Sequence, residues 1–457
     1  MTRLDETQEL EERFAQLRED LKGNHLQDFR ENFLEMHIYE QSQFYQTLEK
    51  KQRQLVYAYL SPKELADMFD ALEEDNENIK NYLGEMRANY ASEMLAQMYT
   101  DNAVDLLNTL DKKQMGKYLS LMNEEDASEI KELLHYEDET AGAIMTTEFV
   151  SIVANQTVRS AMYVLKKVAK AAETIYYTYV VDQDNQLVGV ISLRDLLVSD
   201  DDEMVADILN DRVISVHVGD DQEDVAQTFR DYDFLALPVT DYEDHLLGIV
   251  TVDDIIDVID DEAASDYSGL AGVNVEEVHE NPVKAASKRL PWLITLLFLG
   301  MATASLINHY EALVSEASIL AAFITLITGT AGNAGTQSLA VAVRRLAFND
   351  NKAKSYLQTI LGEVLTGLVT GLITGLTILV IVWIWKGNPI LGFVIGMAMM
   401  CAITVANLAG SLIPMFMDKL GFDPAVASGP FITTLSDLTS VLIYFNIASL
   451  FMSYFIG

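Results

Sequence analysis

The most unusual ionisable residue in this sequence is Asp437, a lone carboxylate in an apolar segment. It lies within residues 431–456, which contain no other charged side chain. Placing a carboxylate near the centre of a membrane span costs about 2.5–3.5 kcal/mol, and carboxylates kept at that depth usually face a path for ions or protons. The sequence therefore predicts an ion-conducting site at Asp437.

The distribution of charge indicates which ion is involved. The chain has 457 residues and a formal net charge of −38, yet only seven of its 69 Asp and Glu residues follow residue 290. An acidic half of this kind is a poor partner for nucleic acid, because phosphate binding needs a basic face. Divalent cations are the natural counter-ions for so many carboxylates, although an acidic surface can also serve solubility alone.

Five apolar stretches are long enough to cross about 30 Å of hydrocarbon. They are residues 290–307, 319–343, 357–385, 390–416 and 431–456. Lys and Arg residues flank the first span and the connection between the second and third. This bias predicts a multi-pass protein of the cytoplasmic membrane, with the N-terminus in the cytosol and the C-terminus outside. The first 30 residues lack the apolar core of a signal peptide, which agrees with a cytosolic acidic half.

Several spans contain residues that a plain lipid anchor does not need. The run from Gly329 to Ser338 includes Asn and Gln, and it predicts a bent or loosened helix that lines a cavity. Gly367, Gly371 and Gly375 predict close helix packing. Pro424 and Pro430 weaken regular hydrogen bonding before Asp437, so carbonyls and hydroxyls there are expected to face a pore. Glu363 is expected to reach only the membrane interface.

The soluble half contains an internal repeat with an offset of 59 residues. Val180-Val181-Asp182 recurs as Val239-Thr240-Asp241, and the run from Leu187 to Ile191 recurs as Leu246 to Val250. Each unit reads as strand, turn, strand and helix. This pattern resembles a tandem CBS pair, a module that often binds adenosine nucleotides, so ATP is a candidate ligand.

The segment before this repeat reads as helices only. Apolar positions recur at helical spacing in residues 60–72, 94–107 and 118–134, and a second repeat has an offset of 24. Residues 263–287 are partly amphipathic and could couple the cytosolic part to the first span. Taken alone, the acidic residues on these helices are solvated surface charges or caps.

Taken together, these motifs resemble the MgtE family of magnesium channels and transporters. The resemblance rests on residues 141–146, 329–338 and 423–437. It implies a multidomain membrane protein that forms a homodimer in the lipid bilayer, with the pore on the dimer axis. The implied domains are an all-α superhelical N-terminal domain (1–140), an α/β tandem CBS pair (141–262, divided near 208), a connecting plug helix (263–289) and an all-α domain of five transmembrane helices (290–457).

The resemblance also implies the metal-binding residues. Asp437 would be the pore carboxylate and Asp423 would lie at the cytosolic mouth. The regulatory Mg²⁺ ligands would be Asp67, Asp101, Asp105, Glu223, Asp233, Asp254, Asp257, Glu262, Asp266 and the backbone carbonyl of Arg230. Two positions depart from the family pattern: Ser265 stands where an acidic residue is expected beside Asp266, and Ser440 stands where Gly is usual.

These observations favour a Mg²⁺ channel that Mg²⁺ itself closes. Facing carboxylates repel one another when cytosolic Mg²⁺ is low, and bound Mg²⁺ would favour a compact, closed state. Two alternatives stay open: a membrane-anchored nucleotide sensor, and a gradient-driven transporter for divalent ions such as Co²⁺ or Ni²⁺. The sequence shows no His or Cys cluster for a softer metal, and Cys401 is its single cysteine. It shows no P-loop, nucleophile motif or catalytic His arrangement, so an enzyme is not expected.

Overall fold

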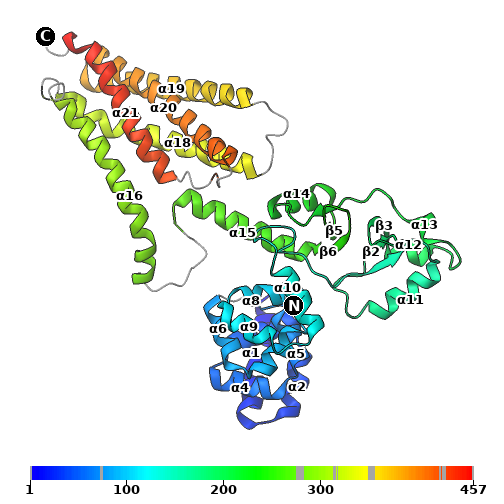
Figure 1. The fold of residues 1–457 in the computed structure, drawn as a ribbon. Coiled ribbons are helices and arrows are strands. Elements are labelled where there is room, and N and C mark those ends of the chain that lie inside the picture. The colour runs from blue at the N-terminus through cyan, green and yellow to red at the C-terminus, as the bar shows by residue number, and fades with distance from the viewer. Residues whose placement is uncertain are drawn as a thin grey trace. The chain divides into compact units, whose positions relative to one another are not determined.

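The computed structural model describes residues 3–72, 76–273, 282–311, 318–347, 356–420 and 429–454, together with residues 315 and 424. The chain divides into two compact units, Met1–Val258 and Ile259–Gly457. Figure 1 shows the first as short helices and two small sheets, and the second as long helices.

The N-terminal part consists of one longer helix followed by short helices that, from α2 on, begin about every twelve residues (Figure 1). They are α1 (Arg3–Gly23), α2 (Leu26–Leu34), α3 (Ile38–Gln46), α4 (Lys50–Tyr59), α5 (Pro62–Phe69), α6 (Asn76–Glu85), α7 (Ala88–Leu95), α8 (Thr100–Asn108), α9 (Lys112–Leu119) and α10 (Glu124–Leu133). The pair α7–α8 therefore repeats as α9–α10 with the expected offset of 24.

Local capping signals set the length of these helices. Ser61 and Glu64 form a capping box at α5, Asp111 caps α9, and Asn123 caps α10. The stretches 94–107 and 118–134, in which apolar positions recur at helical spacing, each contain a helix end and a new start. Apolar spacing alone did not reveal the break, since both helices of each pair turn their apolar side chains to the same core.

The CBS pair forms two three-stranded sheets with the same topology. The first contains β1 (Ser151–Val153), β2 (Tyr177–Val181) and β3 (Leu187–Ser192), and the second contains β4 (Val216–His217), β5 (Ala236–Thr240) and β6 (Leu246–Thr251). In each sheet the first two strands are parallel and the last two antiparallel. Helices α11 (Val158–Val168), α12 (Leu193–Val198), α13 (Val205–Ile208) and α14 (Gln222–Tyr232) complete the pair.

The two CBS units are joined at equivalent positions of the repeat. The backbone NH of Leu187 donates to Asp244 O at 2.9 Å, and that of Leu246 donates to Asn185 O at 3.1 Å. These two bonds exchange under the offset of 59, so the pair has an approximate internal two-fold symmetry. The repeat seen in the sequence is thus the repeat of the structure.

The expected connecting helix, 263–289, is divided between two longer helices. Helix α15 runs without interruption from Val252 to Ala271, so it begins in the second CBS unit and passes the expected boundary at residue 262. Helix α16 (Pro282–His309) begins before the first span and continues through it. Residues 274–281 lie outside the described part of the chain.

In the second unit, five helical segments are long and apolar enough to cross a membrane. They are α16, a short 3₁₀ turn (Ser318–Phe323) continued by α18 (Ile324–Ala347), α19 (Tyr356–Lys386), α20 (Pro389–Lys419) and α21 (Gly429–Leu450). The last helix ends at Leu450, earlier than the predicted residue 456. Ser318–Phe323, Ile327 and residues of α20 and α21 contribute to one buried apolar core.

The expectation of a bent helix at Gly329–Ser338 was wrong, because α18 is a continuous α-helix there. Two of its glycines, Gly332 and Gly335, lie in close contact with α21. A Cβ on Gly335 would lie 2.9 Å from Ile432 Cγ2 of α21, and a Cβ on Gly410 of α20 would lie 2.2 Å from Gly335 O. Small residues let backbones approach closely in a membrane, where lipid provides no hydrophobic drive for helix association.

Candidate metal sites

Three carboxylates meet where the second CBS unit passes into α15. Asp253 and Asp254 lie in the first turn of α15, and Glu173 lies between α11 and β2. One ligand oxygen from each residue lies within 4.8 Å of the other two. Thr251 donates hydrogen bonds to Asp254 from both its hydroxyl and its backbone NH, which holds that carboxylate in place. The cluster thus brings the first CBS unit into contact with the second.

A fourth carboxylate, Asp101 on α8, comes from the N-terminal helices. Its side chain is only 5% exposed, and its Oδ1 has no hydrogen-bond partner among the described residues. Burial raises the pKa of Asp101 well above its usual value, and the negative charges of Asp254 and Glu173 raise it further. A buried carboxylate without a partner is costly, so this position favours a cation beside it.

Burial also raises the pKa values of two other carboxyl groups in the cluster. Burial raises the pKa of Glu173 to about 8, with Asp254 and Asp253 adding to the effect. Burial also raises the pKa of Asp254 to about 6. Oxygen-only donors from several carboxylates are the ligands that Mg²⁺ prefers. The residues therefore fit a divalent cation that would neutralise them.

Hydrogen bonds next to this cluster connect the N-terminal helices to the CBS pair. The Thr100 hydroxyl donates to Glu148 Oε1 at 2.6 Å and lies 3.0 Å from the Thr147 hydroxyl. Thr146 donates to the other oxygen of Glu148 at 2.6 Å. Asp101 follows Thr100 directly, so these contacts position its carboxylate against the CBS pair.

The structure does not bring all the predicted ligands to this cluster. Asp105 and Asp257 are exposed, about one turn after Asp101 and Asp254 on their helices. Asp67 is half exposed and pairs with Lys63 at 3.0 Å. Glu262 and Asp266 lie further along α15, four residues apart on one face.

The predicted ligands of α14 lie along that helix and at its end. Glu223 is in the first turn and Arg230 in the last, where Arg230 Nη1 donates to Gln227 Oε1 at 3.3 Å. Asp233 ends the helix in a left-handed conformation with φ 54°. Its backbone carbonyl therefore no longer points along the helix like those of the preceding residues. The predicted ligand Asp423 lies outside the described residues.

In the membrane unit, Asp437 is half-buried on α21, eight residues after Gly429. This spacing places it about 12 Å along the helix axis. Thr433 and Thr434 donate their hydroxyls to Gly429 O and Pro430 O of their own helix, which leaves the oxygen lone pairs as acceptors. Ser440 is fully buried, and its hydroxyl has no hydrogen-bond partner in the described part of the chain.

The expectation for Glu363 was wrong, because its side chain is buried and paired. Arg345 Nη1 donates to Glu363 Oε1 at 2.9 Å, and the Ser338 hydroxyl donates to Oε2 at 3.1 Å. Ser338 also donates to Asn407 O, so the group joins α18, α19 and α20. Arg345 is two turns after Ser338, and the sequence alone does not show that both face Glu363.

Sequence reasoning missed Glu173 altogether. It lies in an irregular stretch before β2, where neither strand nor helix spacing predicts the direction of a side chain. It also missed the grouping of His25 with Asp20 and Asp28 at the turn between α1 and α2, although the run Gly23-Asn24 there is a recognisable helix stop.

A small cavity of about 70 Å³ lies between the two CBS sheets. Tyr177 and Tyr179 of β2 line one side, Phe234 and Pro238 line the other, and Arg212 also borders the space. Aromatic rings beside a cation can hold an adenine ring and a phosphate. These side chains are of the kind that bind the nucleotide expected from the repeat, but a cavity of about 70 Å³ is too small to hold a whole nucleotide without opening.

Comparison with known proteins follows the same division of the chain. Residues 324–447 match the family described as a divalent cation transporter, MgtE; residues 36–139 match the MgtE intracellular N domain; and residues 141–200 and 205–261 match the CBS domain. A magnesium transporter MgtE from Enterococcus faecalis is 79% identical over 99% of this chain and its own full length.

The chain belongs to the MgtE family. The magnesium transporter MgtE of Bacillus subtilis is 37% identical over 94% of this chain and 96% of its own length. Among solved structures, the soluble part of a magnesium transporter is 78% identical and covers 56% of this chain and all of its own, with a TM-score of 0.55. The cytosolic domain of the Mg²⁺ channel MgtE in complex with ATP is 35% identical and covers 54% of this chain and 99% of its own, with a TM-score of 0.51.

Family membership settles the fold class as a multidomain membrane protein with a helical N-terminal domain, a CBS pair and five apolar helices. Because residues 36–139 match an intracellular domain, the N-terminal helices lie in the cytosol.

Proposed function

We propose that this protein conducts Mg²⁺ into the cell as a homodimer, and that cytosolic Mg²⁺ closes it. The observation that carries the proposal is Asp437, the lone carboxylate of α21, at about 12 Å from the start of the helix. Two such residues facing one another across a two-fold axis would attract a hydrated Mg²⁺ through its water shell. Binding of this kind is strong enough for entry and weak enough for release.

The surface of α18 supports a second copy or a water-filled path beside the pore helix. Asn333 and Gln337 are four residues apart on one face and are both exposed in the subunit. Polar side chains at membrane depth generally face a bundle interior or a water-filled cavity. In a homodimer with its pore on the two-fold axis, this face of α18 would lie in the bundle interior or beside the water-filled pore. With the N-terminus in the cytosol, five spans would place the C-terminus outside the cell.

Regulation would begin at the carboxylates of Asp101, Glu173, Asp253 and Asp254. Without a cation, their charges repel one another, and the N-terminal helices would separate from the CBS pair. Bound Mg²⁺ would hold these parts together. Moving a two-state equilibrium from 1:99 to 99:1 takes about 5.5 kcal/mol of differential binding, which several weak sites can supply jointly. Asp67, Asp105, Glu223, Asp233, Asp257, Glu262, Asp266, Asp423 and the Arg230 carbonyl are the further candidates.

Helix α15 provides a covalent route from these carboxylates to the pore helix. Its first turn holds Asp253 and Asp254. Near its other end, Leu270 packs against Leu339 and Ile432, and a Cβ added to Gly429 would lie 3.0 Å from Leu270 O. A shift of α15 would therefore reach the first residues of α21. ATP at the cavity between the CBS sheets would act on the same pair and adjust the response.

Mg²⁺ flux into proteoliposomes tests the proposal directly. Wild-type protein is expected to admit Mg²⁺, and Asp437→Asn is expected to abolish the flux while its elution profile and thermal melting stay unchanged. Asp418→Asn, which removes an exposed carboxylate at the end of α20, is the matched control and is expected to conduct. Unchanged flux in Asp437→Asn would overturn the proposal. Flux that follows an imposed proton gradient would favour a gradient-driven transporter, and no flux in the wild type would favour a membrane-anchored sensor.

A further inference from the structure

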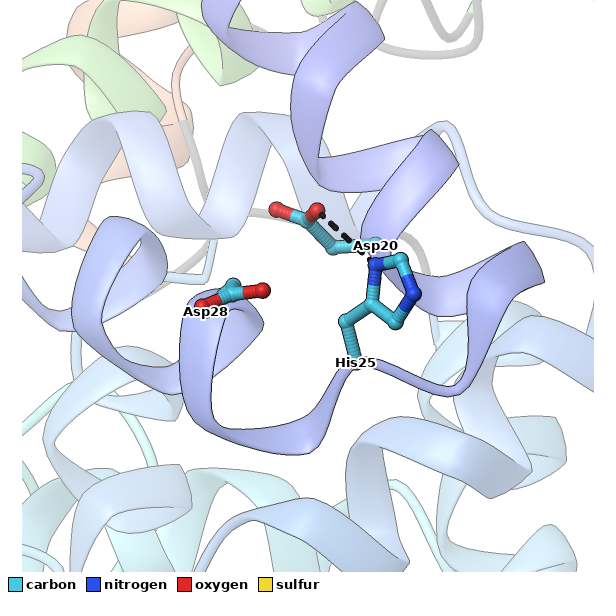
Figure 2. A group of neighbouring side chains, drawn as sticks. All are labelled: Asp20, His25 and Asp28. Atoms are coloured by element: carbon cyan, nitrogen blue, oxygen red, sulfur yellow. Dashed lines mark ion pairs between the residues drawn. The ribbon is translucent and has the colours of Figure 1, made fainter.

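The turn between α1 and α2 brings together one imidazole and two carboxylates, far in sequence from the transport machinery. Asp20 lies near the end of α1, His25 lies in the turn, and Asp28 lies in the first turn of α2 (Figure 2). One ligand atom from each residue lies within 4.8 Å of the other two. Figure 2 shows the three side chains directed toward a common space.

Asp20 is held firmly before any ion arrives. Its side chain is 3% exposed, and each oxygen accepts a hydrogen bond from a neutral amide: Oδ1 from Gln16 Nε2 and Oδ2 from Asn32 Nδ2, both at 3.1 Å. A carboxylate oxygen has a second lone pair, so both oxygens can still bind a cation. Outer hydrogen bonds of this kind orient a metal ligand and fix its position.

The backbone of the turn places His25 beside Asp20. The NH of His25 donates to Asp20 O at 2.9 Å, and Asn24 takes a left-handed conformation with φ 56°. The imidazole lies over Gly23, where an added Cβ would be 2.8 Å from His25 Cε1. Glycine at position 23 thus leaves room for the ring in this orientation.

The gap between the donors fits a metal ion better than a direct contact. His25 Nδ1 lies 3.9 Å from Asp20 Oδ1, which is too long for a hydrogen bond. A tetrahedral ion bonded at about 2.0–2.2 Å to both atoms would hold them about 3.3–3.6 Å apart, so they need to approach by only a few tenths of an ångström. His25 and Asp28 are exposed, so their side chains can close on the ion while buried Asp20 stays fixed.

We propose that Asp20, His25 and Asp28 form a binding site for a first-row transition-metal ion, with Zn²⁺ as the best match. One imidazole nitrogen and two carboxylate oxygens suit Zn²⁺, whereas Mg²⁺ selects oxygen ligands alone. Water would complete the coordination. The bound ion would link the end of α1 to the start of α2. It would thereby stabilise the connection between the first two helices of the cytosolic domain. This site is independent of the proposed Mg²⁺ conduction.

Cobalt provides a spectroscopic test on the full-length protein in detergent. Co²⁺ is titrated in the presence of a large excess of Mg²⁺, which occupies the oxygen-only sites. The expected result is one equivalent per subunit with visible d–d absorption, displaced by Zn²⁺. His25→Ala and Asp28→Asn each remove one exposed ligand, and each is expected to weaken Co²⁺ binding at least about tenfold, as loss of a metal ligand does.

Two controls make the outcome decisive. His135→Ala removes an exposed imidazole elsewhere in the same helical domain and is expected to leave the Co²⁺ spectrum unchanged. Thermal melting with and without Zn²⁺ gives a second measurement, and stabilisation by Zn²⁺ is expected to vanish in His25→Ala and to persist in His135→Ala. Absence of Co²⁺ absorption in the wild type, or an undiminished signal in both His25→Ala and Asp28→Asn, would overturn the site. Neither result would bear on Mg²⁺ flux.

Discussion

Arg345 and Glu363 form a 2.9 Å ion pair that joins α18 to α19 within the unit of membrane helices. Glu363 is nearly buried, and Ser338 donates to its second oxygen. A charge in such surroundings is tolerated because it is paired and hydrogen-bonded. The pair therefore serves helix packing.

Glu363→Gln is expected to destabilise the protein by about 1–3 kcal/mol, because it leaves Arg345 without its charged partner. Thermal melting in detergent measures the loss. The double variant with Arg345→Gln should be less destabilised than the sum of the two single variants, since the residues are in contact. Additive effects would show that the pair contributes no coupling. Asp418→Asn, an exposed carboxylate, provides the baseline.

Gly375→Ala is expected to lower the melting temperature, whereas Gly362→Ala on the same helix is expected to be neutral or slightly stabilising. A Cβ on Gly375 would lie 2.5 Å from Gly396 O, a backbone atom that cannot move aside without shifting α20. Among the described residues, no atom beyond the neighbouring residues and backbone of its own helix lies within 4 Å of a Cβ on Gly362. Alanine is preferred over glycine in a helix by about 1 kcal/mol when space allows. Equal melting of the two variants would contradict close α19–α20 packing.

The apparent affinity of the cytosolic carboxylates for Mg²⁺ is expected to rise between pH 6.5 and 8.5. Burial raises the pKa of Glu173 to about 8, so the folded protein retains a proton there at neutral pH, and Mg²⁺ must displace it. Without a cation, the folded state holds more protons than the unfolded state between about pH 4 and 8, and its stability falls as pH rises through that range.

Mg²⁺-dependent protection of the full-length protein from protease, measured at both pH values, checks this prediction. Glu173→Gln is expected to flatten the pH dependence because it removes the titrating group. A wild-type protein whose Mg²⁺ affinity does not change with pH would refute the assignment of Glu173 to the cluster.

Neutralising Asp254 and Asp257 together is expected to leave the channel conducting at millimolar cytosolic Mg²⁺. Without these charges, the cation has less to bridge between the N-terminal helices and α15, so closure loses its driving force. Patch-clamp recording with varied cytosolic Mg²⁺ measures the response. Asp260→Asn, exposed on the same helix, serves as the control. Closure at the wild-type Mg²⁺ concentration in the double variant would remove these residues from the sensor.

Arg212→Ala is expected to weaken ATP binding about tenfold or more, because it removes the cation that borders the cavity between the CBS sheets. Equilibrium dialysis of the full-length protein with labelled ATP measures the affinity. Arg159→Ala removes an exposed arginine that pairs with Asp201 and Asp202 and is expected to have no effect. Equal loss in both variants would indicate non-specific charge attraction.

Local patterns in the sequence were sufficient for several parts of this fold. The offset of 59 predicted two equivalent strand–strand–helix units, and Leu187 and Leu246 confirm it by exchanging equivalent backbone bonds. The apolar runs predicted five spanning helices, and the described residues contain five helices long and apolar enough to span a membrane. Both signals are periodic and depend on neighbours along the chain, so a single sequence carries them.

Other features depended on residues that meet only after folding. Asp437 was recognisable from the sequence because the free-energy cost of a carboxylate there comes from the apolar residues next to it along the chain. The sequence could not show that Glu363 is paired, because its partners lie on α18, 18 and 25 residues away. Glu173 of the first CBS unit meets Asp254 at the start of α15, and buried Asp101 approaches both from the N-terminal helices. Charge content and helix period follow from the order of residues, whereas distances between carboxylates follow from how the helices and sheets pack.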